Sequence, residues 1–197
     1  SIDRRTTVTI ESGEQDYAVL ENLNYHGCFK YEGDDAGIRN ALEAIKKSLA
    51  EISTPVKVTV TSEIPQSRGM GSSAAFCVAL SAAALAFSGR PFDRQQVFQR
   101  ACALESLFHG TSSCIDPACS TFGGFLAFSK STGPKQINCS MLEGLSFCVV
   151  DSKIARSTSA INEKLKGLIA AQPQLESVFD EIDLLIGKVL DGFVTVY

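Results

Sequence analysis

The sequence lacks tryptophan, long basic runs and long uninterrupted apolar runs. Its basic residues form no cluster larger than the pairs Arg4-Arg5 and Lys46-Lys47, and the formal net charge of the 197 residues is −4. We therefore expect no nucleic-acid partner, because proteins that bind nucleic acids carry a basic patch or stripe. The most apolar stretch, residues 74–87, is too short and too rich in alanine and serine to span a bilayer, so no membrane partner is expected.

The seven cysteines also lack a recognisable framework. Their number is odd, no Cys-x-x-Cys spacing occurs, and Cys77, Cys102 and Cys148 lie inside apolar runs. An odd number cannot be fully paired within one chain, and the spacings of common metal and redox motifs are absent. We interpret the cysteines as reduced thiols of a cytoplasmic protein, with disulfides as the alternative.

The composition is that of a globular protein with a substantial core. Hydrophobic residues make up 45% and charged residues 20% of the chain, close to the values of ordinary soluble domains. No internal repeat or low-complexity linker occurs. The length fits one large domain, or one domain with part of another.

Apolar periodicity predicts a mixture of strands and helices. Alternating or continuous apolar residues predict strands, and a period near 3.6 predicts helices. The predicted strands cover residues 1–10, 17–23, 56–64, 124–128 and 145–152. The predicted helices cover residues 37–51, 72–87 and 93–108, and the segments that follow Ser157 and Pro173. Asp93 and Gln96 are expected to form a capping box, and the last two helices are expected to bury apolar faces that contain Leu165 and Leu185.

The segment 65–76, PQSRGMGSSAAF, joins a predicted strand to a predicted buried helix. Gly69 and Gly71 allow a ligand to approach the backbone, and the helix N-terminus after them favours an anion. The segment therefore predicts a phosphate-binding loop, although an ordinary capped turn would also explain it. It is not a Walker A loop, because no lysine follows the second glycine.

A second polar segment follows the helix that carries Glu105. Residues 109–124 are rich in small side chains and place His109 and Asp116 between two glycine turns. Such a segment buries little, which is typical of a binding loop. For His109 we favour packing or ordering of the loop over direct chemistry.

These motifs resemble those of the GHMP kinases, a superfamily of small-molecule kinases. PQSRGMGSSAA is similar to their second signature motif. Glu105, HGTSSCID and STFGG follow one another as in the mevalonate kinase family, whose pattern is Glu, His-Gly-x-Pro-Ser-Gly-(Ile/Val)-Asp and Ser-Thr-(Trp/Tyr)-Gly-Gly. Two positions depart from it: Ser112 replaces the proline, and Cys114 replaces a glycine, which matters if that position needs a positive φ.

The resemblance implies an α+β GHMP kinase fold. A ribosomal-protein-like N-terminal domain would cover residues 1–150, and residues 151–197 would begin a ferredoxin-like C-terminal domain. The family's first and third motifs are not found, and we interpret the chain as an internal portion of a longer kinase.

The resemblance also implies site residues, with ATP and Mg²⁺ as cofactors. Asp116 would be the catalytic base, Ser73 and Glu105 the magnesium ligands, and Arg156 and Thr158, in a segment similar to the family's Pro-Arg-(Ser/Asn)-Thr, the substrate contacts. The ATP phosphates would be held by Arg68, Gly69, Met70, Gly71, Ser72 and Ser73.

The implied reaction is phosphorylation of mevalonate to 5-phosphomevalonate in isoprenoid biosynthesis. Two alternatives stay open. One is another GHMP kinase that acts on phosphomevalonate or a sugar, and the other is a GHMP-fold protein that binds nucleotide without turnover. A homodimer is also left open.

Overall fold

The computed structural model describes residues 3–110, 112–138, 146, 148–150 and 158–194. These residues divide into two compact units, Ser1–Gly123 and Gly124–Tyr197, and each is described by itself. Within the described residues, we find no helix both long and apolar enough to cross a bilayer.

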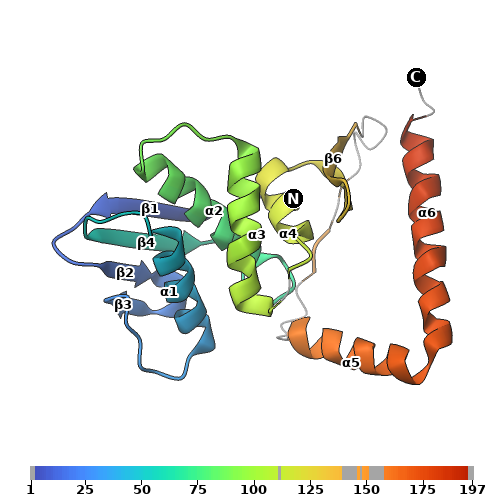
Figure 1. The fold of residues 1–197 in the computed structure, drawn as a ribbon, viewed down its shortest axis with the longest axis horizontal. Coiled ribbons are helices and arrows are strands. Elements are labelled where there is room, and N and C mark those ends of the chain that lie inside the picture. Colours follow the sequence, from blue (N-terminus) through green and yellow to red (C-terminus); the bar gives the residue numbers. More distant parts are fainter. Residues whose placement is uncertain (1–2, 111, 139–145, 147, 151–157, 195–197) are drawn as a thin grey trace. The chain divides into compact units, whose positions relative to one another are not determined.

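The first unit is built on a mixed four-stranded sheet whose strands have the order β1-β4-β2-β3 (Figure 1). The strands are β1 (Thr6–Ser12), β2 (Tyr17–Leu20), β3 (Tyr25–Gly27) and β4 (Val56–Ser62). Strand β4 is antiparallel to β1 and parallel to β2, and β3 returns antiparallel to β2. A short 3-10 helix, η1 (Glu21–Leu23), ends β2 earlier than the sequence predicts, and the three-residue β3 was not predicted.

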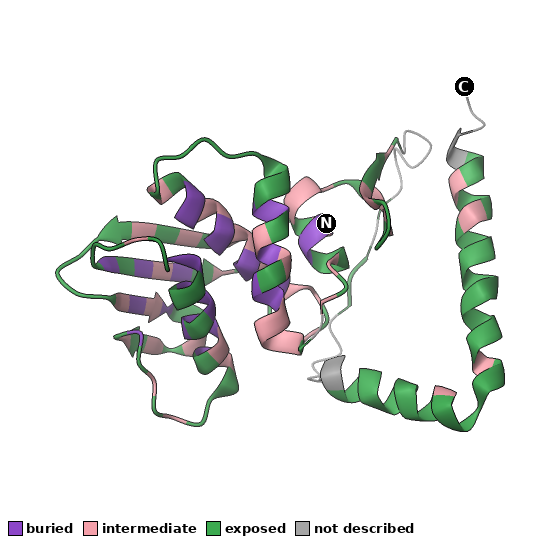
Figure 2. Cartoon of the chain, viewed as in Figure 1, coloured by how far each residue is buried: buried purple, intermediate pink, exposed green. Residues whose placement is uncertain are grey.

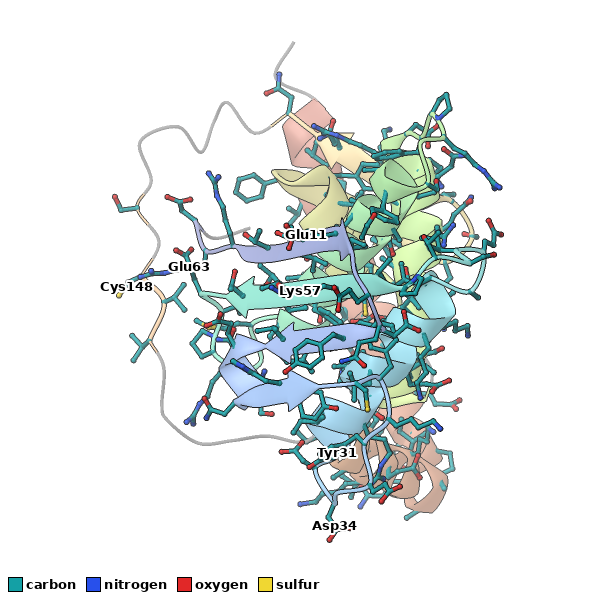
Figure 3. All side chains as sticks on the ribbon, turned by 90° about the vertical axis from the view of Figure 1, so that its left-hand side faces the viewer. Glu11, Tyr31, Asp34, Lys57, Glu63 and Cys148 are labelled. Carbon is teal, nitrogen blue, oxygen red and sulfur yellow. A yellow bond between two sulfur atoms is a disulfide. The ribbon has the colours of Figure 1, made fainter. Side chains whose placement is uncertain are left out.

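Helices cover one face of this sheet. They are α1 (Ala36–Ser48), α2 (Ser72–Phe87), α3 (Arg94–His109) and α4 (Ile115–Phe122). The alternation along β4 places Val56, Val58 and Val60 in the core, whereas Lys57 lies on the uncovered face beside Glu11 of β1 (Figure 3). A sheet with helices segregated to one face is the α+β arrangement that the sequence predicts.

The cores of α1 and α2 follow from their sequence patterns. The apolar stripe of α1 (Ile38, Leu42, Ile45) is buried against the sheet, and the Asp35 carboxylate caps the helix by accepting N–H bonds from Gly37 and Ile38. Helix α2 is apolar on all sides and packs against β1, α3 and α4 (Figure 2). The predicted capping box at the start of α3 is also present, since Asp93 and Gln96 bond each other's backbone N–H groups.

Helix α4 corrects the prediction that residues 109–124 form a loop that buries little. Its Pro117 and Ala118 are buried, and α4 packs against both α2 and α3. A proline is tolerated in the first turn, where its missing N–H has no intrahelical partner, and an aspartate there is favoured by the helix dipole. Small residues that predicted a loop thus form one short helix that packs against two longer ones.

The second unit contains a hairpin and two long helices. The elements are β5 (Phe125–Ser129), β6 (Gly133–Ile137), α5 (Thr158–Ala171), the 3-10 helix η3 (Pro173–Leu175) and α6 (Glu176–Val194). Strand β6 was not predicted, and the strand predicted over 145–152 is wrong for residues 146 and 148–150, which have no regular structure. The rest of that predicted strand lies outside the described residues.

Helices α5 and α6 form where the periodicity predicts them, but their apolar faces are not buried by the described residues. Leu165 is 41% and Leu185 59% exposed, and Figure 2 shows both helices as mainly exposed. Amphipathic periodicity determines which side of a helix is apolar, whereas burial requires a partner surface.

The role of the α1 stripe can be tested by truncating Leu42, which is fully buried. We expect Leu42→Ala to lower the free energy of unfolding by about 2–5 kcal/mol, through lost apolar burial and the cavity left behind. Lys47→Ala, at an exposed position of the same helix, should change it by no more than about 0.5 kcal/mol. Urea unfolding followed by far-UV circular dichroism measures both; equal effects would mean that α1 does not pack as described.

Candidate active site

The predicted phosphate loop leads into the N-terminus of α2. Gly71 is the residue before the helix and has φ +67°, and Gly69 also has a positive φ, +72°. Ser72 and Ser73 form the first turn of α2, and Arg68, half-buried, precedes the glycines with Met70 between them. First-turn N–H groups and the dipole of a 16-residue helix favour an anion at this position.

Asp116 lies directly beside this loop. A Cβ atom added to Gly71 would be 3.8 Å from Asp116 Cγ and 3.9 Å from Asp116 Oδ2. Asp116 is exposed and belongs to the first turn of α4. The packing of α4 against α2 therefore brings an accessible carboxylate next to the glycine backbone of the predicted phosphate loop.

Glu105 is the buried carboxylate of the site. It is 4% exposed and lies on α3, where the Ser112 hydroxyl donates a hydrogen bond to its Oε2 atom. Burial raises the pKa of Glu105; the nearby Asp116 carboxylate adds to the increase, while the bond from Ser112 and the charge of His109 oppose it. The sequence pattern predicts that Glu105 lies on this helix, but it gives no sign of the contact from Ser112, which stands out only as a departure from the family pattern.

His109 connects α3 to the predicted magnesium ligand Ser73. Its Nε2 atom lies 3.1 Å from Ser73 Oγ, and the tautomer of the ring decides which of the two groups donates. This bond supports the ordering role that we favoured for His109.

Cys77 also lies on α2. Burial raises the pKa of its thiol, and the Glu105 carboxylate adds to the increase, so this thiol is kept protonated.

Two of the cysteines contradict the prediction that all are reduced. The structure joins Cys102 of α3 to Cys114, the residue before α4, with their Cα atoms 5.3 Å apart. Cys28, Cys77, Cys119 and Cys148 are free. The two bonded cysteines are 12 positions apart in the sequence, and only the packing of α3 against α4 brings them together, so spacing along the chain could not reveal the bond.

Glu105 and Ser73 are suited to a magnesium ion by their chemistry. Magnesium prefers oxygen ligands and binds through one or two carboxylates together with substrate phosphates. Within the part of the chain that the structure describes, Glu105 has no lysine or arginine ion pair and there is no group of three acidic, histidine or cysteine side chains that could hold a metal by themselves. Such a site would therefore depend on phosphate oxygens as further ligands.

The remaining predicted contacts are not brought to this site by the described structure. Arg156 lies outside the described residues, and Thr158 begins α5 in the second unit. A hollow lined by residues of β1, η1 and β4, together with Arg5 just before β1 and Glu63 just after β4, contains none of the predicted site residues.

The chain is similar in sequence to known kinases. The family model of the GHMP kinases N terminal domain matches residues 37–124. The mevalonate kinase of Aeropyrum pernix is 30% identical over 96% of this chain and 61% of its own length. The mevalonate kinase of Thermococcus onnurineus is 36% identical over 47% of this chain and 28% of its own. The chain thus spans at most about three fifths of these relatives.

Solved structures share the fold. The Methanococcus jannaschii mevalonate kinase matches with a TM-score of 0.68 and 21% identity over 98% of this chain and 63% of its own. The L. major mevalonate kinase, in complex with R-mevalonate, also has a TM-score of 0.68, with 19% identity over 96% of this chain and 59% of its own. Residues 37–124 match the GHMP kinases N terminal domain, and this part of the chain is therefore a GHMP kinase N-terminal domain.

Proposed function

We propose that the protein transfers the terminal phosphoryl group of ATP to the hydroxyl of mevalonate, which gives 5-phosphomevalonate for isoprenoid biosynthesis. The relatives named above are mevalonate kinases, and one of the similar structures holds R-mevalonate. The order of Glu105, His109 and Asp116 matches that family's pattern, and the proposal extends it to this chain.

One observation carries the proposal: the Asp116 carboxylate lies within 4 Å of where a Cβ would stand on Gly71. Phosphoryl transfer needs mainly positioning and neutralisation of charge. A carboxylate beside the phosphate loop is suited to accept the proton of a hydroxyl that attacks the terminal phosphate. In this proposal residues 68–73 bind the phosphates, and Asp116 holds the acceptor hydroxyl.

Ser73 and Glu105 would hold Mg²⁺, which supplies positive charge against the phosphates when bound. The protein's own contribution is to orient the two ligands. His109 holds the Ser73 hydroxyl and Ser112 holds the Glu105 carboxylate, so each ligand is fixed by a partner from another segment of the site.

Further parts of the proposal extend beyond the described site. Arg156 and Thr158 would contact mevalonate, and residues 1–150 and 151–197 would belong to the N-terminal and C-terminal domains. A cytoplasmic location is inferred from the predominance of free cysteines among those described. A panel of mevalonate, phosphomevalonate and galactose, with ADP release as readout, separates mevalonate kinase from the related kinases.

The glycine that Cys114 replaces in the family pattern does not by itself favour the alternative, a GHMP-fold protein without turnover. Cys114 adopts the left-handed conformation, with φ +63°, although this conformation is one in which a glycine would be expected. With Cys114 bonded to Cys102, the replacement is compatible with the helical start of α4 and with Asp116 beside Gly71.

Nucleotide binding should depend on the backbone at Gly71. At 100 times its dissociation constant, MgATP should stabilise the wild-type chain by about 2.7 kcal/mol. We expect Gly71→Val to abolish this stabilisation, because a β-branched residue is strained at positive φ and its side chain would point at Asp116. Thermal unfolding with and without MgATP is the measurement.

The matched control is Gly89→Val. Gly89 has φ +68° and follows the opposite end of the same helix, with no atom within 4 Å of an added Cβ. This variant should lose similar intrinsic stability but keep its response to MgATP. A Gly71→Val protein that keeps the full response would exclude the loop from the nucleotide site.

Ser73 and Glu105 should act together in metal binding. We expect Ser73→Ala and Glu105→Gln each to raise the Mg²⁺ concentration for half-maximal nucleotide binding at least on the order of tenfold, a loss that even outer partners of a metal ligand produce. The loss of binding free energy in the double variant should be smaller than the sum of the losses in the two single variants. The control is Ser106→Ala, whose hydroxyl donates to the Ala103 carbonyl within α3. Strict additivity of the two single effects would contradict a shared ion.

Asp116 should matter for the chemical step and hardly for ATP affinity. In the active kinase we expect Asp116→Asn to lower kcat by about 10²–10⁴-fold, because the amide keeps the shape but cannot accept the proton. His109→Ala, which removes the partner of Ser73, should lower kcat less and shift the Mg²⁺ requirement instead. Steady-state kinetics over a range of Mg²⁺ concentrations distinguishes the two, and a larger kcat loss in His109→Ala would transfer the role of base to the histidine.

A further inference from the structure

The loop that leads into α4 is held in a conformation that its own sequence disfavours. Cys114 has φ +63° and is the residue before α4, two positions ahead of Asp116. A side chain at positive φ crowds the following carbonyl group, so a non-glycine residue there needs support from its surroundings.

Two bonds connect this loop to α3. The Ser112 hydroxyl donates to Glu105 and accepts the Cys114 N–H at 3.0 Å. The second connection is the disulfide from Cys114 to Cys102, which lies one helical turn before Glu105 and on the same side of α3. The 5.3 Å between the two Cα atoms lies within the roughly 4.4–6.8 Å that a disulfide spans without backbone movement.

We propose that Cys102 and Cys114 form a reversible thiol–disulfide pair that controls how firmly residues 112–116 are held against α3. In the oxidised form the covalent bond maintains the left-handed conformation of Cys114 and the start of α4. In the reduced form the Ser112 bonds remain, and Cys114 is free to leave its disfavoured conformation. This rests on the proposed function only in that the loop then controls the position of Asp116.

The redox step balances with a small-molecule disulfide such as glutathione disulfide as oxidant. The two cysteine thiols lose two electrons and two protons, the S–S bond of the oxidant breaks, and two molecules of its thiol form while the Cys102–Cys114 bond forms. Cys102 and Cys114 are both only half-buried, so they are accessible to such an oxidant. Cys77, in contrast, is fully buried and its thiol is kept protonated.

The bond can be identified directly on the 197-residue chain. The chain is equilibrated with glutathione disulfide or with dithiothreitol, free thiols are alkylated, and a protease that cleaves after glutamate separates Cys102 from Cys114 at Glu105. We expect mass spectrometry to find the two peptides linked only after oxidation. The link should be absent in Cys102→Ser and Cys114→Gly and present in Cys119→Ser, which removes the neighbouring free cysteine.

The effect on the loop is measured by thermal unfolding and amide hydrogen exchange. Oxidation should raise Tm by about 5–15 °C, the shift expected for a disulfide in a chain of this size, and slow exchange at residues 112–116. Cys102→Ser should show neither change. Cys114→Gly should also lose the response, but reduced Cys114→Gly should be at least as stable as reduced wild type, because glycine adopts positive φ freely.

Two results would overturn the proposal: no link between the two peptides after oxidation, or the same oxidation response in Cys102→Ser. None of these readouts uses nucleotide or turnover. A redox response without MgATP binding would refute the proposed function alone, and mevalonate kinase activity without a redox response would refute this proposal alone.

Discussion

The packing of α2 against α3 and α4 is the constraint on which the candidate site depends. Helix α2 is apolar almost all round, so it can be buried by the sheet on one side and by two further helices on the others. This burial aligns its N-terminus with the end of α3 and the start of α4. Because of it, Ser73, Glu105 and Asp116, which belong to three different helices, lie at one place in the first unit.

The same packing buries the Glu105 carboxylate near that of Asp116, and a bound cation would stabilise both negative charges. Glu105 is removed from water beside a second carboxylate, Asp116, and its pKa is raised, mainly through burial. One hydroxyl, that of Ser112, offsets part of this cost. Buried carboxylates are usually paired or coordinate metals, and a site that binds a magnesium nucleotide supplies such positive charge. The destabilised carboxylate is therefore consistent with the proposed function.

The segment around Cys114 is held by tertiary contacts rather than by the backbone preferences of its own residues. A glycine adopts positive φ without cost, whereas Cys114 is bonded to Cys102 in that conformation. A proline restricts the backbone by its ring, whereas Ser112 bonds both the Cys114 N–H and Glu105. In both cases an intrinsic backbone preference is replaced by a tertiary contact with α3.

The sequence alone predicted most of the helices and strands, the capping box at Asp93, the glycine-rich turn before α2 and the resemblance to a kinase family, because periodicity, capping and glycine spacing act over a few residues. Only the tertiary structure decided that residues 115–122 are a helix, that Ser112 and His109 orient Glu105 and Ser73, and that Cys102 meets Cys114. The exposed apolar faces of α5 and α6 show the same limit: periodicity marks the apolar side of a helix but does not say what covers it. Contacts between segments distant in sequence depend on how whole helices pack, which no short pattern encodes.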